Sequence, residues 1–138
     1  AIYAYGILDI DDPLVTESIA TIEEKLRINT GIDGVPRYTG GRYYFQVEGI
    51  PNPWYITTLW LAQYYAKAAQ KPEDLDNVRH WINWVVIHSP KSRALSEQLH
   101  PFTGEQLSAT PLTWSHAEYI RTVIAYYQAL KRMGLCDA

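Results

Sequence analysis

The sequence predicts an all-α fold of about four helices with two long loops. Four segments place apolar residues at helical intervals, and two stretches rich in glycine, proline and polar residues separate them. The 138 residues match the size of one domain, and 47% of them are hydrophobic, which is enough for a packed core. Residues 1–138 are therefore expected to form a single domain or a fragment of one.

The first predicted helix runs roughly from Pro13 to Asn29. Asp12 before Pro13 is typical of an N-cap followed by proline at the first helical position. The apolar side of the segment recurs at helical spacing and consists of Val15, Ile19, Ile22 and Leu26. Because glutamates and a lysine occupy the other sides, one face is expected to lie in solvent. Gly31 and Gly34 end the helix.

The second predicted helix, about Pro53 to Ala69, is expected to be buried on nearly every side. Asn52 before Pro53 repeats the pattern of a cap followed by proline. Apolar side chains cover all its faces, namely Trp54, Ile56, Leu59, Trp60, Leu61, Ala62, Tyr64 and Tyr65. A helix that is apolar all round is normally packed all round.

Two further helices are predicted toward the C-terminus. One begins at Lys71-Pro72, ends near His88, and has an inward face of Leu75, Val78, Ile82 and Val85. The other runs from about Trp114 to Met133, and Ser115 and Glu118 have the spacing of a capping box. Its apolar residues recur at helical intervals at Ala117, Ile120, Ile124 and Tyr127.

Two long loops, residues 33–52 and 89–112, lead into the second and fourth helices. The segment from Arg42 to Val47 can form a short strand within the first loop. Loops of this length are uncommon in compact domains and are often functional. Amphipathic helices alternate with strongly apolar ones, which suits concentric layers with some helices outside and others lining the centre.

The composition excludes several classes of protein. The net charge is −3 with both signs interspersed, which is not the basic footprint of a nucleic-acid binder. The longest mostly apolar run, Trp54 to Ala69, is too short and too polar to span a membrane. Cys136 is the single cysteine, which allows no internal disulfide, and no Cys/His cluster indicates a metal site. No cofactor is expected, and a cytoplasmic location is the default. The chain begins at Ala1 rather than Met without a signal peptide, which suits a piece of a longer protein.

Short motifs in both loops resemble those of one enzyme family. The first loop contains Gly34-Val35-Pro36-Arg37-Tyr38 and ends at Asn52-Pro53-Trp54. The second contains Glu97-Gln98, Gly104-Glu105-Gln106-Leu107-Ser108 and Leu112-Thr113-Trp114-Ser115. In this order, and with Asp11-Asp12-Pro13 upstream, they resemble glucoamylases and related glycoside hydrolases of family 15 over nearly the whole chain.

The resemblance implies the C-terminal part of an (α/α)6 double barrel, with the two long loops at the active-site end. It also implies inverting hydrolysis of α-linked glucosides such as glucan oligosaccharides, dextran or trehalose, without choosing among them. Inverting hydrolysis needs a carboxylic acid that protonates the leaving oxygen and a carboxylate that activates water on the opposite face, roughly 6.5–9.5 Å apart.

The resemblance also implies roles for individual residues. Glu97 is the general base, and Gln98 beside it orients the site. Arg37 and Tyr38 contact substrate hydroxyls, and Trp114 forms a wall of the sugar pocket. Two alternatives stay open, because Arg37 can instead pair with a loop carboxylate and Trp114 can instead be a core anchor.

Three departures from the family pattern stand out. Gly41 occupies a position that is often aspartate, and Ser96 replaces the alanine common before the base. The segment bearing the general acid lies upstream in the family and is absent here. Because general acid–base catalysis contributes about 10²–10⁴-fold, the isolated chain is expected not to turn over substrate efficiently.

The expected partners are a carbohydrate substrate and either the remainder of the barrel or a second copy of the chain, since the apolar helices must be covered. Nucleic acid and membranes are not expected partners. Two other functions stay open, namely a non-catalytic carbohydrate-binding or regulatory module that kept the fold, and a helical interaction domain that binds no sugar.

Overall fold

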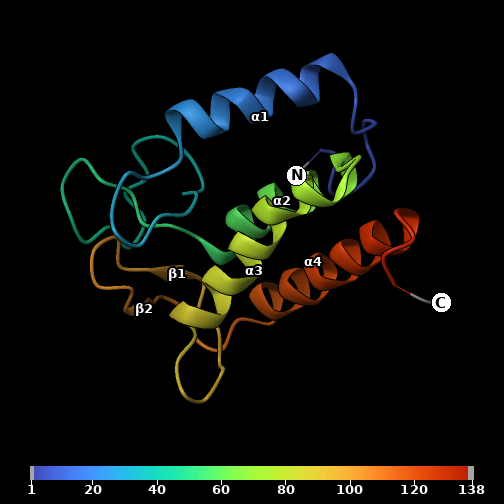
Figure 1. Cartoon of the computed structure of the whole chain (residues 1–138). Helices are drawn as coiled ribbons and strands as arrows, with labels where there is room; N and C mark the ends of the chain where they lie inside the picture. The colour runs from blue at the N-terminus through green and yellow to red at the C-terminus, as the bar shows by residue number, and fades with distance from the viewer. Residues whose placement is uncertain (1, 137–138) are drawn as a thin grey trace.

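The computed structural model describes residues 2–136 and is mainly helical (Figure 1). Its elements in chain order are α1 (Pro13–Lys25), α2 (Tyr55–Ala68), the 3-10 helix η1 (Pro72–Leu75), α3 (Asp76–His88), β1 (Gln98–Leu99), β2 (Gln106–Leu107) and α4 (Thr113–Arg132). The four predicted helices are therefore present, and each lies within a few residues of its predicted bounds.

Helix α2 lies at the centre and packs against both α3 and α4. In Figure 1, α2 and α4 run in the same direction, whereas α1 and α3 run the opposite way. Hydrogen bonds join α2 to α4 along their length, from Thr122 Oγ1 to the Leu59 carbonyl near the middle and from Arg132 to the Ala66 carbonyl near the ends. Helix α2 is therefore the helix against which both of the helices that follow it are packed.

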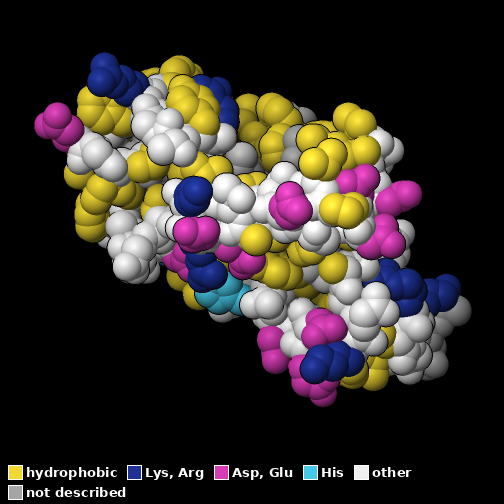
Figure 2. Space-filling view, turned by 90° about the horizontal axis from the view of Figure 1, so that it is seen from above, with side chains coloured by type: hydrophobic (Ala, Val, Ile, Leu, Met, Phe, Trp, Pro, Cys, Tyr) yellow, Lys and Arg dark blue, Asp and Glu magenta, His cyan; other side chains and the backbone are white. Residues whose placement is uncertain are grey.

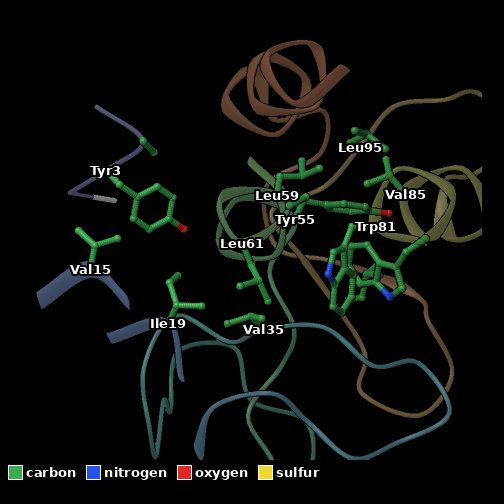
Figure 3. Close-up of a cluster of buried hydrophobic side chains, with 14 residues drawn as sticks. Tyr3, Val15, Ile19, Val35, Tyr55, Leu59, Leu61, Trp81, Val85 and Leu95 are labelled. Atoms are coloured by element: carbon green, nitrogen blue, oxygen red, sulfur yellow. The ribbon is translucent and has the colours of Figure 1, made fainter. Parts of the chain in front are cut away.

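The apolar composition of α2 corresponds to its burial. Of the residues in α2, only Lys67 is exposed. Figure 3 shows Leu61 pointing toward Val35 and Ile19 on one side, while Tyr55 lies near Trp81 on another. Helix α1 contributes Val15 and Ile19 to this cluster, and its other residues are mostly exposed.

Both long loops lie at the same end of the helices, where α1 and α3 end and α2 and α4 begin (Figure 1). β1 and β2 pair as a small antiparallel hairpin, with Gln98 opposite Leu107 and Leu99 opposite Gln106. The strand predicted for Arg42 to Val47 is wrong, because this segment forms turns with Tyr44 at a φ of 58°. Positive φ at a tyrosine interrupts an extended strand.

One predicted helix cap is confirmed and two are wrong. Asp12 accepts a hydrogen bond from the Leu14 backbone N–H at 2.8 Å. Asn52 does not cap α2, since Trp54 is the N-cap and the Asn52 amide donates elsewhere. Ser115 and Glu118 form no capping box, because α4 already begins at Thr113 and the Ser115 hydroxyl donates to the Ser96 carbonyl.

Helix α4 turns its larger apolar residues outward. The side chains of Ile120, Ile124 and Tyr127 are 59%, 49% and 46% exposed. Its buried residues are small or polar, namely Ser115, Glu118, Thr122, Ala125 and Ala129. The apolar periodicity that marked this helix therefore lies on the face away from α2.

The surface carries both signs of charge. On the face seen in Figure 2, Lys and Arg side chains are interspersed with Asp and Glu, and apolar patches lie between them. Within residues 2–136, no helix has the length and apolarity needed to cross a membrane. The same residues contain no group of three or more His, Cys, Asp or Glu placed to hold a metal ion.

Candidate active site

Glu97 lies immediately before β1, where the second loop contacts the start of α2. Its backbone N–H donates to the Ala109 carbonyl at 3.0 Å, and its carbonyl accepts from the Tyr55 N–H at 3.3 Å. The strand after it is held too, since the Leu99 N–H donates to the Pro53 carbonyl at 3.0 Å. The backbone of Glu97 is therefore fixed beside the N-terminal end of α2.

The Glu97 carboxylate accepts two hydrogen bonds, and both end on the same oxygen. Oε2 accepts from the Ser108 hydroxyl at 2.6 Å and from the Gln98 side-chain amide at 3.2 Å. The Tyr43 hydroxyl lies 3.4 Å from Ser108 Oγ. Because the Ser108 proton is directed at Glu97, Tyr43 must be the donor in that contact. A chain of hydroxyls thus leads from the first loop to the carboxylate.

Ser108 occupies an uncommon backbone conformation. Its φ is 67°, in the left-handed region that residues other than glycine seldom adopt. Such strain persists only where the surroundings over-determine it, and it clusters at functional sites. Here it accompanies the hydroxyl that holds the Glu97 carboxylate.

The Gln106 side chain ties the β1–β2 hairpin to the helices beside it. Its side-chain amide donates to the His88 carbonyl at 2.7 Å and to the Tyr55 hydroxyl at 2.9 Å, and its oxygen accepts from the Ser96 N–H at 2.9 Å. Burial raises the pKa of Tyr55 to about 12 despite the opposing effect of the Gln106 hydrogen bond. Tyr55 therefore acts as a neutral hydroxyl that ties the hairpin to α2 and α3.

Gln98 is fully buried and connects the two loops. Its backbone pairs with that of Trp54 in an isolated antiparallel β-bridge, and its side-chain oxygen accepts from the Asn52 amide at 2.9 Å. Asn52 is 3% exposed and also donates to the Tyr44 carbonyl at 2.9 Å. The Ser96 hydroxyl donates to the Gln98 carbonyl at 2.5 Å, which gives the serine before Glu97 a structural role that alanine cannot fill.

Arg37 extends from a loop segment that is anchored to α2. Val35 forms this anchor, since its N–H donates to Thr58 Oγ1 at 2.9 Å and its carbonyl accepts from the Trp54 N–H at 3.0 Å. The Arg37 guanidinium lies over the rings of Trp54, Tyr38 and Tyr43 at 4.6, 4.9 and 5.6 Å.

The salt bridges found within residues 2–136 do not include Arg37. Arg37 therefore does not pair with a loop carboxylate among these residues, which was the alternative to substrate binding. The positive charge is held instead in an aromatic cage beside a small pocket, whose lining includes Arg37, Tyr38 and Gln98 together with Asn52 and Trp54. Tyr38 is 45% exposed, so it is available to a ligand.

Trp114 lies apart from this pocket, whose lining as drawn from residues 2–136 does not include it. It is 46% exposed at the start of α4, its ring packs edge-on against Trp60, and its Nε1–H donates to the Glu118 carboxylate at 3.1 Å. Glu118 is almost fully buried and also accepts from Tyr5 and Gln63. Trp114 is therefore a half-exposed ring with a fixed orientation rather than a buried core anchor.

The two histidines near Glu97 in sequence act as acceptors for backbone N–H groups. His100 Nδ1 accepts from the Phe102 and Thr103 N–H groups, and His116 Nε2 accepts from the Leu95 N–H at 3.1 Å. Both stabilise the second loop, as expected of structural histidines.

The structure thus brings Arg37, Tyr38 and Gln98 to one pocket and joins Glu97 to it through Gln98, but leaves Trp114 on a neighbouring surface. Sequence reasoning assigned no role in the site to Asn52 or Ser108. Asn52 carried the local signal of a helix cap, and Ser108 stood in the recognised motif without any sign that its hydroxyl reaches back to Glu97.

Three comparisons bear on the identity of the chain. A sequence profile described as Glycosyl hydrolases family 15 matches residues 75–124. An uncharacterized glycosyl hydrolase of Methanocaldococcus jannaschii is 32% identical over 127 residues, covering 86% of this chain and 19% of the relative. The chain therefore spans about a fifth of the length of that protein.

Solved structures share the fold at low sequence identity. A bacterial glucoamylase complexed with acarbose matches with a TM-score of 0.73 and 20% identity, covering 93% of this chain and 19% of that one. The glucoamylase of Hormoconis resinae matches with a TM-score of 0.54 and 21% identity, covering 84% of this chain and 26% of that one. The profile, the sequence relative and the shared fold together identify the chain as a member of glycosyl hydrolase family 15, with the fold expected of the C-terminal part of its (α/α)6 barrel.

Proposed function

We propose that this chain supplies the general base of an inverting glycoside hydrolase that acts on α-linked glucosides, and that Glu97 is the base. One observation carries the proposal, namely that the hydrogen bonds to the Glu97 carboxylate from the described residues all end on Oε2. The two donors hold Oε2 in place, while Oε1 is left to accept a proton from an attacking water. Glu97 is also half-buried, so water and substrate can reach it.

Arg37 and Tyr38 bind substrate hydroxyls in this proposal. The Arg37 guanidinium has no carboxylate partner among the described residues and donates to the Tyr38 hydroxyl at 3.3 Å, so its remaining donors are available to hydroxyl oxygens at the mouth of the pocket. Gln98 sets one wall of the pocket and contacts the base directly. The acarbose complex of the bacterial glucoamylase supports a carbohydrate as the class of ligand.

Trp114 forms a second wall of the sugar-binding site in this proposal, separate from the pocket that Gln98 lines. Its exposed ring is held by Glu118 and Trp60, which suits stacking on a sugar beyond the pocket that Gln98 lines. Among glucan oligosaccharides, dextran and trehalose, the described residues favour none.

The general acid comes from outside this chain in this proposal, because inverting hydrolysis needs a second carboxyl group and the chain spans only 19% of its sequence relative. The remainder of the barrel also covers the outward face of α4, where Ile120, Val123 and Ile124 are 59%, 39% and 49% exposed. The isolated chain is then inactive. Its single cysteine suits a cytoplasmic location.

The test is Glu97→Gln in the enzyme that contains this chain together with the rest of its barrel. Because glutamine cannot accept the proton of water, turnover of maltotriose, an isomaltose oligosaccharide or trehalose is expected to fall by about 10²–10⁴-fold while binding survives. Glu105→Gln is the matched control, since Glu105 is an exposed carboxylate in the same loop.

The outcomes separate the competing functions. Near-normal turnover in Glu97→Gln would refute the assignment of the base. Sugar binding without hydrolysis by the wild-type enzyme indicates a non-catalytic carbohydrate-binding module. If no sugar changes the tryptophan fluorescence of the wild-type protein, a helical interaction domain is the better description.

A further inference from the structure

Asn52 forms an unexpected connection between the two loops. It follows Pro51 at the end of the first loop, where its local sequence predicts a cap for the next helix. Its amide instead uses both of its protons at a distance, on the Tyr44 carbonyl and on Gln98 Oε1, each at 2.9 Å. Asn52 is 3% exposed and Gln98 is fully buried, so water cannot readily substitute for these bonds.

The direction of each hydrogen bond determines the next one. A side-chain amide has an oxygen that only accepts and a nitrogen that only donates. When Asn52 donates to Gln98 Oε1, the Gln98 nitrogen must face the opposite way, and there it donates to Glu97 Oε2 at 3.2 Å. The backbone carbonyl of Tyr44 can only accept, so it fixes the orientation of Asn52 in turn.

The orientation of Asn52 is maintained at a cost. Its own side-chain oxygen is buried and has no hydrogen-bond partner among the described residues, and the residue borders the pocket with Arg37 and Tyr38. A buried acceptor without a partner is unfavourable and uncommon. Asn52 therefore adopts the orientation that satisfies Gln98 rather than one that satisfies itself.

We infer that Asn52 is a positioning residue for the general base: it sets the orientation of the Gln98 amide, which in turn directs its N–H at Glu97 Oε2 and leaves Oε1 for the attacking water. This inference rests on the proposed function of Glu97. It goes beyond it by assigning a role in catalysis to a residue that does not touch the reacting atoms.

The sharpest perturbation is Asn52→Asp, which is nearly isosteric and replaces the donor with an acceptor. The Gln98 amide must then turn its N–H toward the introduced carboxylate and its oxygen toward Glu97. Glu97 loses a donor and gains a repelling oxygen and a nearby negative charge, and each change disfavours the ionised carboxylate. The other ionisable groups that border the pocket are Arg37, Tyr38 and Tyr43, and none of them is altered.

The measurement is the pH dependence of kcat/KM in the enzyme assembled with its whole barrel, with folding checked by circular dichroism. Asn52→Asp is expected to move the acid limb to higher pH by about one unit, with a smaller change in KM than in kcat. Asn52→Ala removes the donor without adding charge, so its acid limb moves in the same direction by less. This second variant decides the question if Asn52→Asp does not fold.

Asn77→Asp is the matched control, because it makes the same change at an exposed position on α3 and should leave the acid limb unchanged. Folded Asn52 variants with the wild-type acid limb would overturn the inference while Glu97→Gln remains inactive. If Glu97→Gln itself keeps its turnover, the proposed base is wrong, whatever the Asn52 variants do. The two failures are therefore distinguishable.

Discussion

Gly34 offers the clearest test of how the Arg37 loop is held against the helices. Its φ is +108°, and a Cβ built there would lie 2.7 Å from Pro53 Cβ, 3.0 Å from Trp84 Cζ2 and 3.3 Å from Thr58 Oγ1. The proline ring and the packed tryptophan leave little room to relax. Gly34→Ala should therefore lose about 1–3 kcal/mol from backbone strain and a further 1–3 kcal/mol from overpacking.

The sum, roughly 2–6 kcal/mol, is a large part of the 5–15 kcal/mol by which an ordinary domain is stable. Urea unfolding followed by tryptophan fluorescence measures it on the chain itself. Two other glycines separate the contributions. Gly6 has a φ of +70° with no atom within 4 Å of the added Cβ, so Gly6→Ala reports backbone strain alone. A Cβ added at Gly31 has no atom within 4 Å, and the residue does not have a positive φ. Gly31→Ala should therefore leave the free energy of unfolding unchanged or raise it slightly.

The close approach of Gly34 to Pro53 and Trp84 predicts that Gly34→Ala is clearly the most destabilising of the three variants. If it loses no more stability than Gly6→Ala, the contact between the first loop and the helices is looser than the distances imply. The account of how Val35 and Arg37 are positioned would then be wrong.

Two further predictions concern the site and its support. Ser108→Ala in the assembled enzyme removes the 2.6 Å donor to Glu97, so kcat should fall, by less than in Glu97→Gln, and the acid limb of kcat/KM should move to higher pH. An unchanged profile would argue against that hydrogen bond. Burial lowers the pKa of His88 below 6.5, outweighing a backbone hydrogen bond that raises it. The unfolded chain then binds the proton more readily, so this contribution to stability is present above pH 6.5 and is lost as pH falls through the native value. The melting temperature should fall as the pH drops below neutral, and it should fall less in His88→Gln than in the wild type. Equal falls in the two proteins would contradict this role of His88.

The helices were predictable because their signals are local. Asp12 caps α1 with its own carboxylate two residues away, and the apolar residues of α2 needed only their density to indicate burial. The assignment of Glu97 as the candidate base rests on a motif rather than on physics, since a glutamate beside a glutamine in a loop has no local feature that marks it as catalytic.

What could not be predicted depends on distant partners. Asn52 has the local pattern of a helix cap, yet its amide bonds to a side chain 46 positions later. Ser115 and Glu118 have the spacing of a capping box, yet their partners are Ser96 and Gln63. In each case a long-range bond in the folded state outcompetes the local one, and no periodicity reveals it.

Helix α4 shows why apolar spacing alone can mislead. Its most regular apolar residues, including Ile120 and Ile124, face outward, because the side toward α2 is occupied by the Gln63–Glu118–Thr122 hydrogen bonds and by small alanines. Alanine lets two helices approach closely, and the polar bonds fix their register. The apolar side is then available to a further layer of helices.

The candidate base is held from both sides by groups within this chain. The Leu95 carbonyl accepts from the Leu112 N–H at 2.8 Å, and the Ser96 carbonyl accepts from the Ser115 hydroxyl at 2.7 Å, so the start of α4 holds the segment before Glu97. Bonds from the start of α2 hold Glu97 and the strand after it. Because these bonds run to the ends of packed helices, they fix the backbone on both sides of Glu97. The side chains of Tyr38 and Trp114 are half-exposed, so they are the parts of the proposed site that further polypeptide or a bound sugar would complete.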